Sequence, residues 1–126
     1  MSEVPLSGTS ILMLEDDFWQ AQDAFDCLED AGAKVVTMTG SASAALDSLD
    51  RRPVDVALLD VNLMGHTSYD VARTLLERGV PVMFLTGYEA DILPDDLADT
   101  PVMTKPIQWP LLISQLKEMV ANAALR

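Results

Sequence analysis

Polar side chains suited to metal and phosphate chemistry come directly after short apolar segments of the chain. One segment ends in Glu15 and Asp16, and three later segments are followed by Asp60, Thr86 and Lys105. Carboxylate oxygens with no His or Cys among them favour Mg²⁺ or Mn²⁺ over Zn²⁺. Lysine and threonine side chains donate hydrogen bonds to phosphate oxygens. The combination predicts a site for a divalent cation and a phosphoryl group.

A shared pocket would place the carboxylates of Glu15, Asp16 and Asp60 beside a single cation, Lys105. Such an excess of like charge must raise a pKa or attract a metal ion. An aspartate carboxylate can also act as a nucleophile and form an aspartyl-phosphate. Phosphoryl transfer then depends on cationic or hydroxyl donors placed around the transferred group. Asp60 as the nucleophile, with Lys105 and Thr86 as donors, supplies these parts.

The elements that must position these residues are five short apolar runs that alternate with segments of helical period. Unbroken hydrophobicity is typical of strands covered on both faces, and this alternation predicts a parallel sheet with helices on both sides. Ligands of such sheets gather outside the carboxyl ends of the strands, where the candidate residues stand. The predicted strands are Ile11 to Leu14, Lys34 to Met38, Val54 to Leu59, Pro81 to Leu85 and Val102 to Thr104.

The helical segments have recognisable starts and stops. Apolar residues recur at helical spacing from Phe18 to Leu28, which predicts that both face the core, and Gly32 ends this helix. Ser41 is expected to cap the second helix. By contrast, Glu89 to Asp99 is acidic and contains Pro94 in its middle, so we expect a short or irregular fourth helix and local mobility.

The size and charge of the chain exclude several classes of protein. The 126 residues fit a single domain, residues 1–126 with a core of about 9–121. With a net charge of -12 and only eight Lys and Arg residues, there is no basic stripe for nucleic acid or an anionic membrane. No apolar run approaches the roughly 18 residues of a membrane span, so a cytoplasmic location is expected. Cys27 is alone and forms no internal disulfide.

Four short motifs resemble those of a known family. "ILMLEDD" contains the acid pair, "LLDVNLMG" contains Asp60, "FLTG" contains Thr86 and "TKP" contains Lys105. In their order and spacing they resemble the receiver domain of two-component response regulators, over roughly residues 9–121. The resemblance implies a flavodoxin-like, doubly wound sheet of five parallel strands in the order 2-1-3-4-5.

The resemblance assigns metal and phosphate roles to the residues of the first two motifs. Asp60 would be the phosphoacceptor, and Glu15 and Asp16 the acid pair, with Asp16 as the more direct metal ligand. Asn62 would offer its backbone carbonyl to Mg²⁺. Asp17, beside the pair, would be a bystander.

The other two motifs would read out phosphorylation. Thr86 would hydrogen-bond the phosphate and move on activation, while Lys105 would pair with a phosphate oxygen. The bond between Lys105 and Pro106 is usually cis in the family, a state accessible at low cost only before proline.

Two positions depart from the family pattern, and one segment points to a subgroup. Met64 stands where the family commonly has proline, and Val102 stands where many members have an aromatic switch residue. Tyr88, which follows Thr86 and Gly87, is a candidate replacement for that aromatic residue. "FLTGY" resembles the aromatic-x-Thr-Gly-aromatic signature of stand-alone receivers from alphaproteobacteria.

The resemblance implies a signalling switch with protein partners. A histidine kinase or phosphotransfer protein would donate the phosphoryl group to Asp60, and a downstream protein would bind the face around the fourth and fifth strands. Only six residues follow Val120, so we expect no attached effector, and the domain would bind a partner or serve as a phosphate sink. It would not be an enzyme beyond its own phosphorylation and dephosphorylation.

Two other functions are weighed against this one. A Mg²⁺-dependent phosphatase with an aspartate nucleophile usually has a general-acid carboxylate two residues later, and this chain has Asn62 there. A receiver-like interaction module that is never phosphorylated tends to lose one of the key residues, and all of them are present here.

Overall fold

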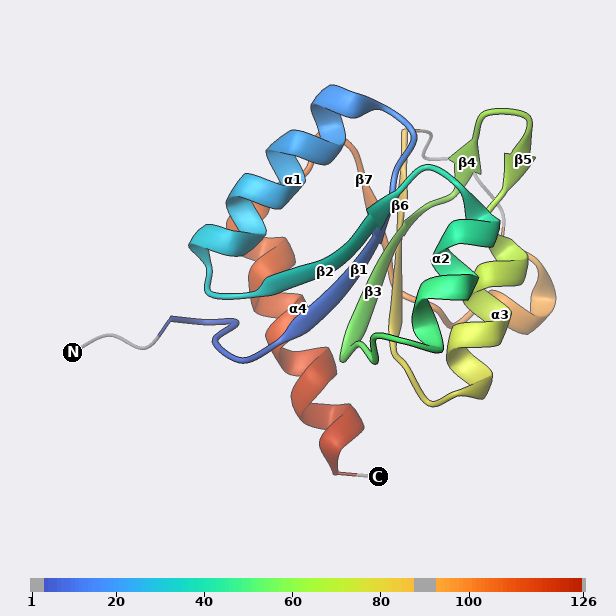
Figure 1. The fold of residues 1–126 in the computed structure, drawn as a ribbon. Helices are drawn as coiled ribbons and strands as arrows, with labels where there is room; N and C mark the ends of the chain where they lie inside the picture. Colours follow the sequence, from blue (N-terminus) through green and yellow to red (C-terminus); the bar gives the residue numbers. More distant parts are fainter. Residues whose placement is uncertain (1–3, 88–92, 126) are drawn as a thin grey trace.

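The computed structural model describes residues 4–87 and 93–125, which form an α/β fold around one parallel sheet (Figure 1). The sheet order is β2-β1-β3-β6-β7. Because β6 and β7 are its fourth and fifth strands along the chain, the predicted order 2-1-3-4-5 is confirmed. The strands are β1 (Ser10–Leu14), β2 (Lys34–Thr39), β3 (Val56–Asp60), β6 (Val82–Thr86) and β7 (Val102–Thr104).

Helices cover both faces of the sheet and divide the core into two halves. Helices α1 and α4 lie on one face, and α2 and α3 lie on the other (Figure 1). Along β1, Ile11 and Met13 belong to the first half and Leu12 and Leu14 to the second, as the alternating side chains of a strand require. The helices are α1 (Phe18–Asp30), α2 (Ala42–Leu49), α3 (Tyr69–Glu77) and α4 (Trp109–Ala124). Among the described residues, no helix has the length and apolar character needed to span a bilayer.

Helix ends follow local side-chain chemistry. Ser41 caps α2, since its hydroxyl accepts a hydrogen bond from the Ala44 amide at 3.2 Å, as the sequence predicts. Asp17 caps α1 through the Gln20 amide at 3.0 Å, which together with other local hydrogen bonds lowers the pKa of the Asp17 carboxyl.

Apart from one-residue shifts at the ends of β1, β2 and β6, three details of the prediction are wrong. β3 begins at Val56 rather than Val54, and it includes Asp60 as its last residue. Phe18 is 68% exposed instead of facing the core. It is the first residue of α1, two residues after Asp16, where it packs edge-on against Trp19 with ring centroids 5.2 Å apart.

The third detail is an element that no prediction included. β4 (Asn62–Leu63) and β5 (His66–Thr67) form a small antiparallel hairpin directly after β3. In Figure 1 the hairpin lies beyond the carboxyl end of β3 and leads into α3.

The connection between β6 and β7 is irregular where it is described. Its only helical element among residues 93–99 is a single 3-10 turn, Asp95–Leu97. This agrees with the expected short or irregular fourth helix over the described part of Glu89 to Asp99. Leu97 is buried in the core, and the Arg73 guanidinium on α3 binds both Asp96 oxygens at 2.7 and 3.2 Å. The mobility expected for Glu89 to Asp99 stays a prediction.

Two glycines with positive φ provide a test of how the chain turns after α1 and α3. Gly32 has φ +95° and Gly79 has φ +80°, where an alanine costs about 1–2 kcal/mol. A Cβ on Gly32 would also collide with the Val4 side chain and lie 3.1 Å from the Ser7 amide nitrogen, whereas a Cβ on Gly79 meets nothing within 4 Å. Gly32→Ala should therefore lower the free energy of unfolding more than Gly79→Ala in urea titrations. Equal losses would contradict the steric part of this account.

Candidate functional site

The predicted site residues converge on the carboxyl edge of the sheet. Asp60 is the last residue of β3 and Thr86 the last residue of β6, while Glu15 directly follows β1 and Lys105 directly follows β7. Asp16 comes next to Glu15. Because these strands are parallel, their carboxyl ends meet at one edge, and four separate segments contribute to one site.

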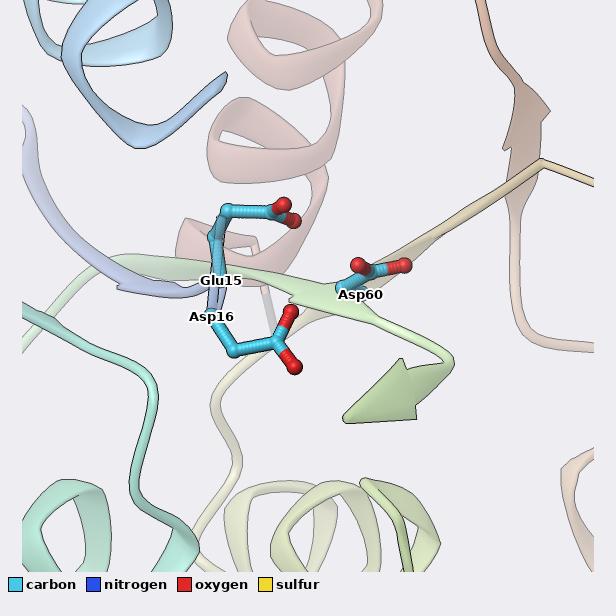
Figure 2. A group of neighbouring side chains, drawn as sticks. All are labelled: Glu15, Asp16 and Asp60. Atoms are coloured by element: carbon cyan, nitrogen blue, oxygen red, sulfur yellow. The ribbon is translucent and has the colours of Figure 1, made fainter. Parts of the chain in front are cut away.

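The three carboxylates form a compact group (Figure 2). One oxygen from each of Glu15, Asp16 and Asp60 lies within 4.8 Å of the others. Glu15 is 4% exposed and Asp60 8% exposed, whereas Asp16 is exposed to solvent. The group is therefore buried on one side and open on the other.

Lys105 is the cation that faces this group. Its Nζ lies 3.3 Å from Glu15 Oε2 and 3.3 Å from Asp60 Oδ2. One ammonium thus serves two buried carboxylates, and Asp16 adds a third negative charge nearby. The site has a negative excess that a proton or a cation would relieve.

The titration of Glu15 reflects this excess. Burial, followed by the hydrogen bond and the negative charge of Asp60, raises the pKa of Glu15 to about 7. Lys105 acts in the opposite direction and does not offset these effects. At neutral pH the metal-free site therefore holds Glu15 close to the midpoint of its titration.

The donor set fits a hard divalent cation. All donors are oxygens, and the open side at Asp16 gives solvent access. Mg²⁺ has oxygen ligands at about 2.1 Å in an octahedron, so opposite ligands are about 4.2 Å apart. The 4.8 Å spread of the three carboxylate oxygens is close to that span. A small side-chain adjustment would bring them into coordination distance.

Thr86 and Lys105 are held together by the backbone of the two last strands. The Lys105 amide donates to the Thr86 carbonyl at 2.7 Å, and Thr86 is 2% exposed. In the pairing of β3 with β6, Asp60 stands opposite Leu85, the residue before Thr86. Thr86 therefore lies one residue beyond the β6 residue that pairs with Asp60.

The remaining predicted residues surround this centre. Asn62 begins β4 and is exposed, as is Gly87 after β6. Val102 begins β7 with 44% of its surface exposed. The bond between Lys105 and Pro106 is cis, and Tyr88 lies outside the described residues.

One polar contact at the site was missed by sequence reasoning. The backbone amide of Met64 donates a hydrogen bond to Asp16 Oδ2 at 2.7 Å. In the sequence, Met64 stands out only as a departure from proline, and its side chain has no obvious chemistry. The available signal was the backbone itself, because any residue other than proline supplies an amide donor at this position.

Comparisons with known proteins agree with this geometry. A family model for the response regulator receiver domain matches residues 11–117. The sensory transduction protein RegX3 of Mycolicibacterium smegmatis is 29% identical over 120 residues, which cover 92% of this chain and 52% of that regulator. The aerobic respiration control sensor protein ArcB of Escherichia coli is 31% identical over 127 residues, covering 92% of this chain and 16% of ArcB.

A solved structure has a similar fold and a related sequence. The solution structure of SdrG from Sphingomonas melonis Fr1 has a TM-score of 0.76 and 30% sequence identity, and the alignment covers 96% of this chain and 99% of SdrG. The chain spans about half the length of RegX3 but nearly all of SdrG. Since the family match covers most of the sequence and the site residues meet at one edge of the sheet, the chain belongs to the response regulator receiver domain family.

Proposed function

We propose that this receiver domain accepts a phosphoryl group on Asp60 from a histidine kinase or a phosphotransfer protein, in a reaction that depends on Mg²⁺ or Mn²⁺. The observation that supports this most directly is the position of Asp60. It ends a central strand, its Oδ2 lies 3.3 Å from Lys105 Nζ, and two more carboxylates stand beside it.

In the proposed transfer, an Asp60 oxygen attacks the phosphorus atom of a phosphohistidine. The P–O bond to Asp60 forms as the P–N bond breaks, and the electron pair of that bond returns to the imidazole of the donor. Lys105 is already beside Asp60 and would pair with a phosphoryl oxygen. Thr86 follows Leu85, the residue of β6 that pairs with Asp60. Its hydroxyl would donate a hydrogen bond to a second phosphoryl oxygen.

Four groups would hold the cation. They are the carboxylates of Glu15, Asp16 and Asp60 and the backbone carbonyl of Asn62. When bound, the cation would neutralise negative charge on the phosphoryl oxygens as the bonds exchange. Asp60 keeps its place in this arrangement because β3 is paired on both sides, with β1 and β6.

The output of this switch is proposed to be a protein contact on the face around β6 and β7. Phosphorylation adds negative charge at Asp60, which would draw Lys105 and Thr86 toward the phosphate and change the surface near them. Val102 replaces the usual aromatic residue at the start of β7, so Tyr88 is the proposed partner of Thr86 in this readout.

We also propose that the domain works without an attached effector, in the cytoplasm, as a member of the subgroup with the "FLTGY" type of signature. The support for the subgroup is the "FLTGY" segment itself, residues 84–88. Such a domain would signal by binding a partner or would compete for phosphoryl groups as a sink. Its only chemical reactions would be its own phosphorylation and dephosphorylation.

Phosphorylation of Asp60 can be tested with a small phosphodonor. Incubation with acetyl phosphate and Mg²⁺ should raise the intact mass by one phosphoryl group, and removal of Mg²⁺ by a chelator should prevent this. Asp60→Asn should gain no mass, while the exposed carboxylate of α2 provides the control Asp47→Asn, which should be modified like the wild type. A phosphoryl adduct that persists in Asp60→Asn would reject the assignment.

The raised pKa of Glu15 gives a second test, on stability. Between pH 4.5 and about 7 the folded metal-free protein binds a proton at Glu15 that the unfolded chain releases. The contribution of this group to stability therefore falls as pH rises through that window.

Glu15→Gln removes the charge and keeps the shape of the side chain. The variant should be more stable than the wild type by about 1–3 kcal/mol at pH 8 without metal, and the difference should vanish below pH 4.5. Urea titrations at both pH values measure it, with the exposed Glu118→Gln as a control. Saturating Mg²⁺ should reverse the order by stabilising the wild type. A variant that is less stable at pH 8 without metal would contradict this.

A further inference from the structure

The hairpin after Asp60 has a turn whose geometry leaves one backbone amide available. Leu63 pairs with His66, so Met64 and Gly65 form a two-residue turn. Gly65 has φ +85°, and among the described residues no amino acid other than glycine has a positive φ. A negative φ at the first turn position and a positive one at the second correspond to a type II turn.

In a type II turn the hairpin does not use the amide of its first central residue. The turn's own hydrogen bond joins the carbonyl of the residue before to the amide of the residue after. The Met64 amide is therefore free to point outward, and it donates to Asp16 Oδ2 at 2.7 Å. This bond joins segments 48 residues apart, and it is of the strong, charge-assisted kind.

The bond joins one of the two Asp16 carboxylate oxygens to the hairpin. Figure 2 shows one Asp16 oxygen on the side of Glu15 and Asp60 and the other on the side of β4. Asp16 is exposed, and two buried carboxylates repel it. Without a fixed donor, both solvation and repulsion would favour turning the group out into water. A hydrogen bond from the hairpin opposes that rotation.

We propose that the backbone amide of Met64 is a positioning group for the divalent cation site. It holds one Asp16 oxygen so that the carboxylate stays directed at Glu15 and Asp60 before the cation arrives. This inference rests on the proposed function and deepens it. Donors that orient a metal-binding carboxylate typically change metal affinity by about 10- to 100-fold when they are removed.

The side chain of Met64 has no part in this role. It is 84% exposed, so its replacement should not disturb the core. A receiver with proline at this position would lack the amide and so could not form the bond. The feature therefore distinguishes this site from receivers that follow the proline pattern.

Two substitutions separate the amide from the side chain. Met64→Pro removes the donor, and proline is well suited to the first central position of a type II turn. Met64→Leu keeps the donor and a side chain of similar size. Isothermal titration of the full chain with Mg²⁺ should give a Kd about tenfold or more weaker for Met64→Pro and an unchanged Kd for Met64→Leu. In urea, metal-free Met64→Pro should be somewhat less stable than the wild type and than Met64→Leu, because it loses the hydrogen bond to Asp16.

A measurement without metal provides an independent check, including the case in which Met64→Pro fails to fold. Exchange of the Met64 amide hydrogen should be slow in the wild type and clearly faster in Asp16→Ala, because that variant lacks the acceptor. Equal exchange rates in the two proteins would overturn the proposal.

The titration distinguishes this proposal from the function on which it rests. Equal Mg²⁺ affinity in the wild type, Met64→Leu and Met64→Pro would overturn the positioning role and leave the phosphoacceptor function standing. A wild-type chain that neither binds Mg²⁺ nor gains a phosphoryl group would instead overturn the proposed function, and the positioning role with it.

Discussion

The mutual repulsion of Glu15 and Asp60, buried side by side, is the constraint on which the rest of the site depends. Two buried carboxylates share one ammonium, that of Lys105, at 3.3 Å from each, and the pKa of Glu15 rises to about 7 as a consequence. Burial of ionised groups is unfavourable unless they are paired. The metal-free site is thus under electrostatic stress, and a cation or a proton relieves it. The proposed Mg²⁺ would relieve the same repulsion.

The scaffold tolerates this arrangement because its two core halves hold the strands from both faces. β3 is buried along its whole length and paired with a neighbour on each side, so Asp60 cannot retreat from Glu15. The parts expected to respond to the site are peripheral. They are the β4–β5 hairpin, whose Met64 amide donates a hydrogen bond to Asp16, and the connection between β6 and β7. That connection contains the 3-10 turn, and its Asp96 binds Arg73 of α3.

The sequence predicts most of the fold because parallel strands buried on both faces leave an unmistakable pattern of short apolar runs. It also predicts which side chains meet, since Asp60, Thr86 and Lys105 each stand at or directly after a strand end. It does not predict the Met64 contact, because every residue except proline has the same backbone amide and only the turn geometry directs it. The prediction for Phe18 is wrong for a related reason. Helical periodicity indicates on which face of a helix a residue lies, but it does not show that the first residue of α1 is exposed to solvent near the site.

The most direct test of this electrostatic account is the titration of the Glu15 carboxyl itself, followed by carbon-13 NMR with and without Mg²⁺. The account predicts a pKa of about 7 in the metal-free protein and a large decrease when Mg²⁺ saturates the site, since a bound cation favours the ionised form. A Glu15 pKa near the ordinary 4.5 in the metal-free protein, unchanged by Mg²⁺, would contradict the claim that crowded carboxylates prepare this site for a cation.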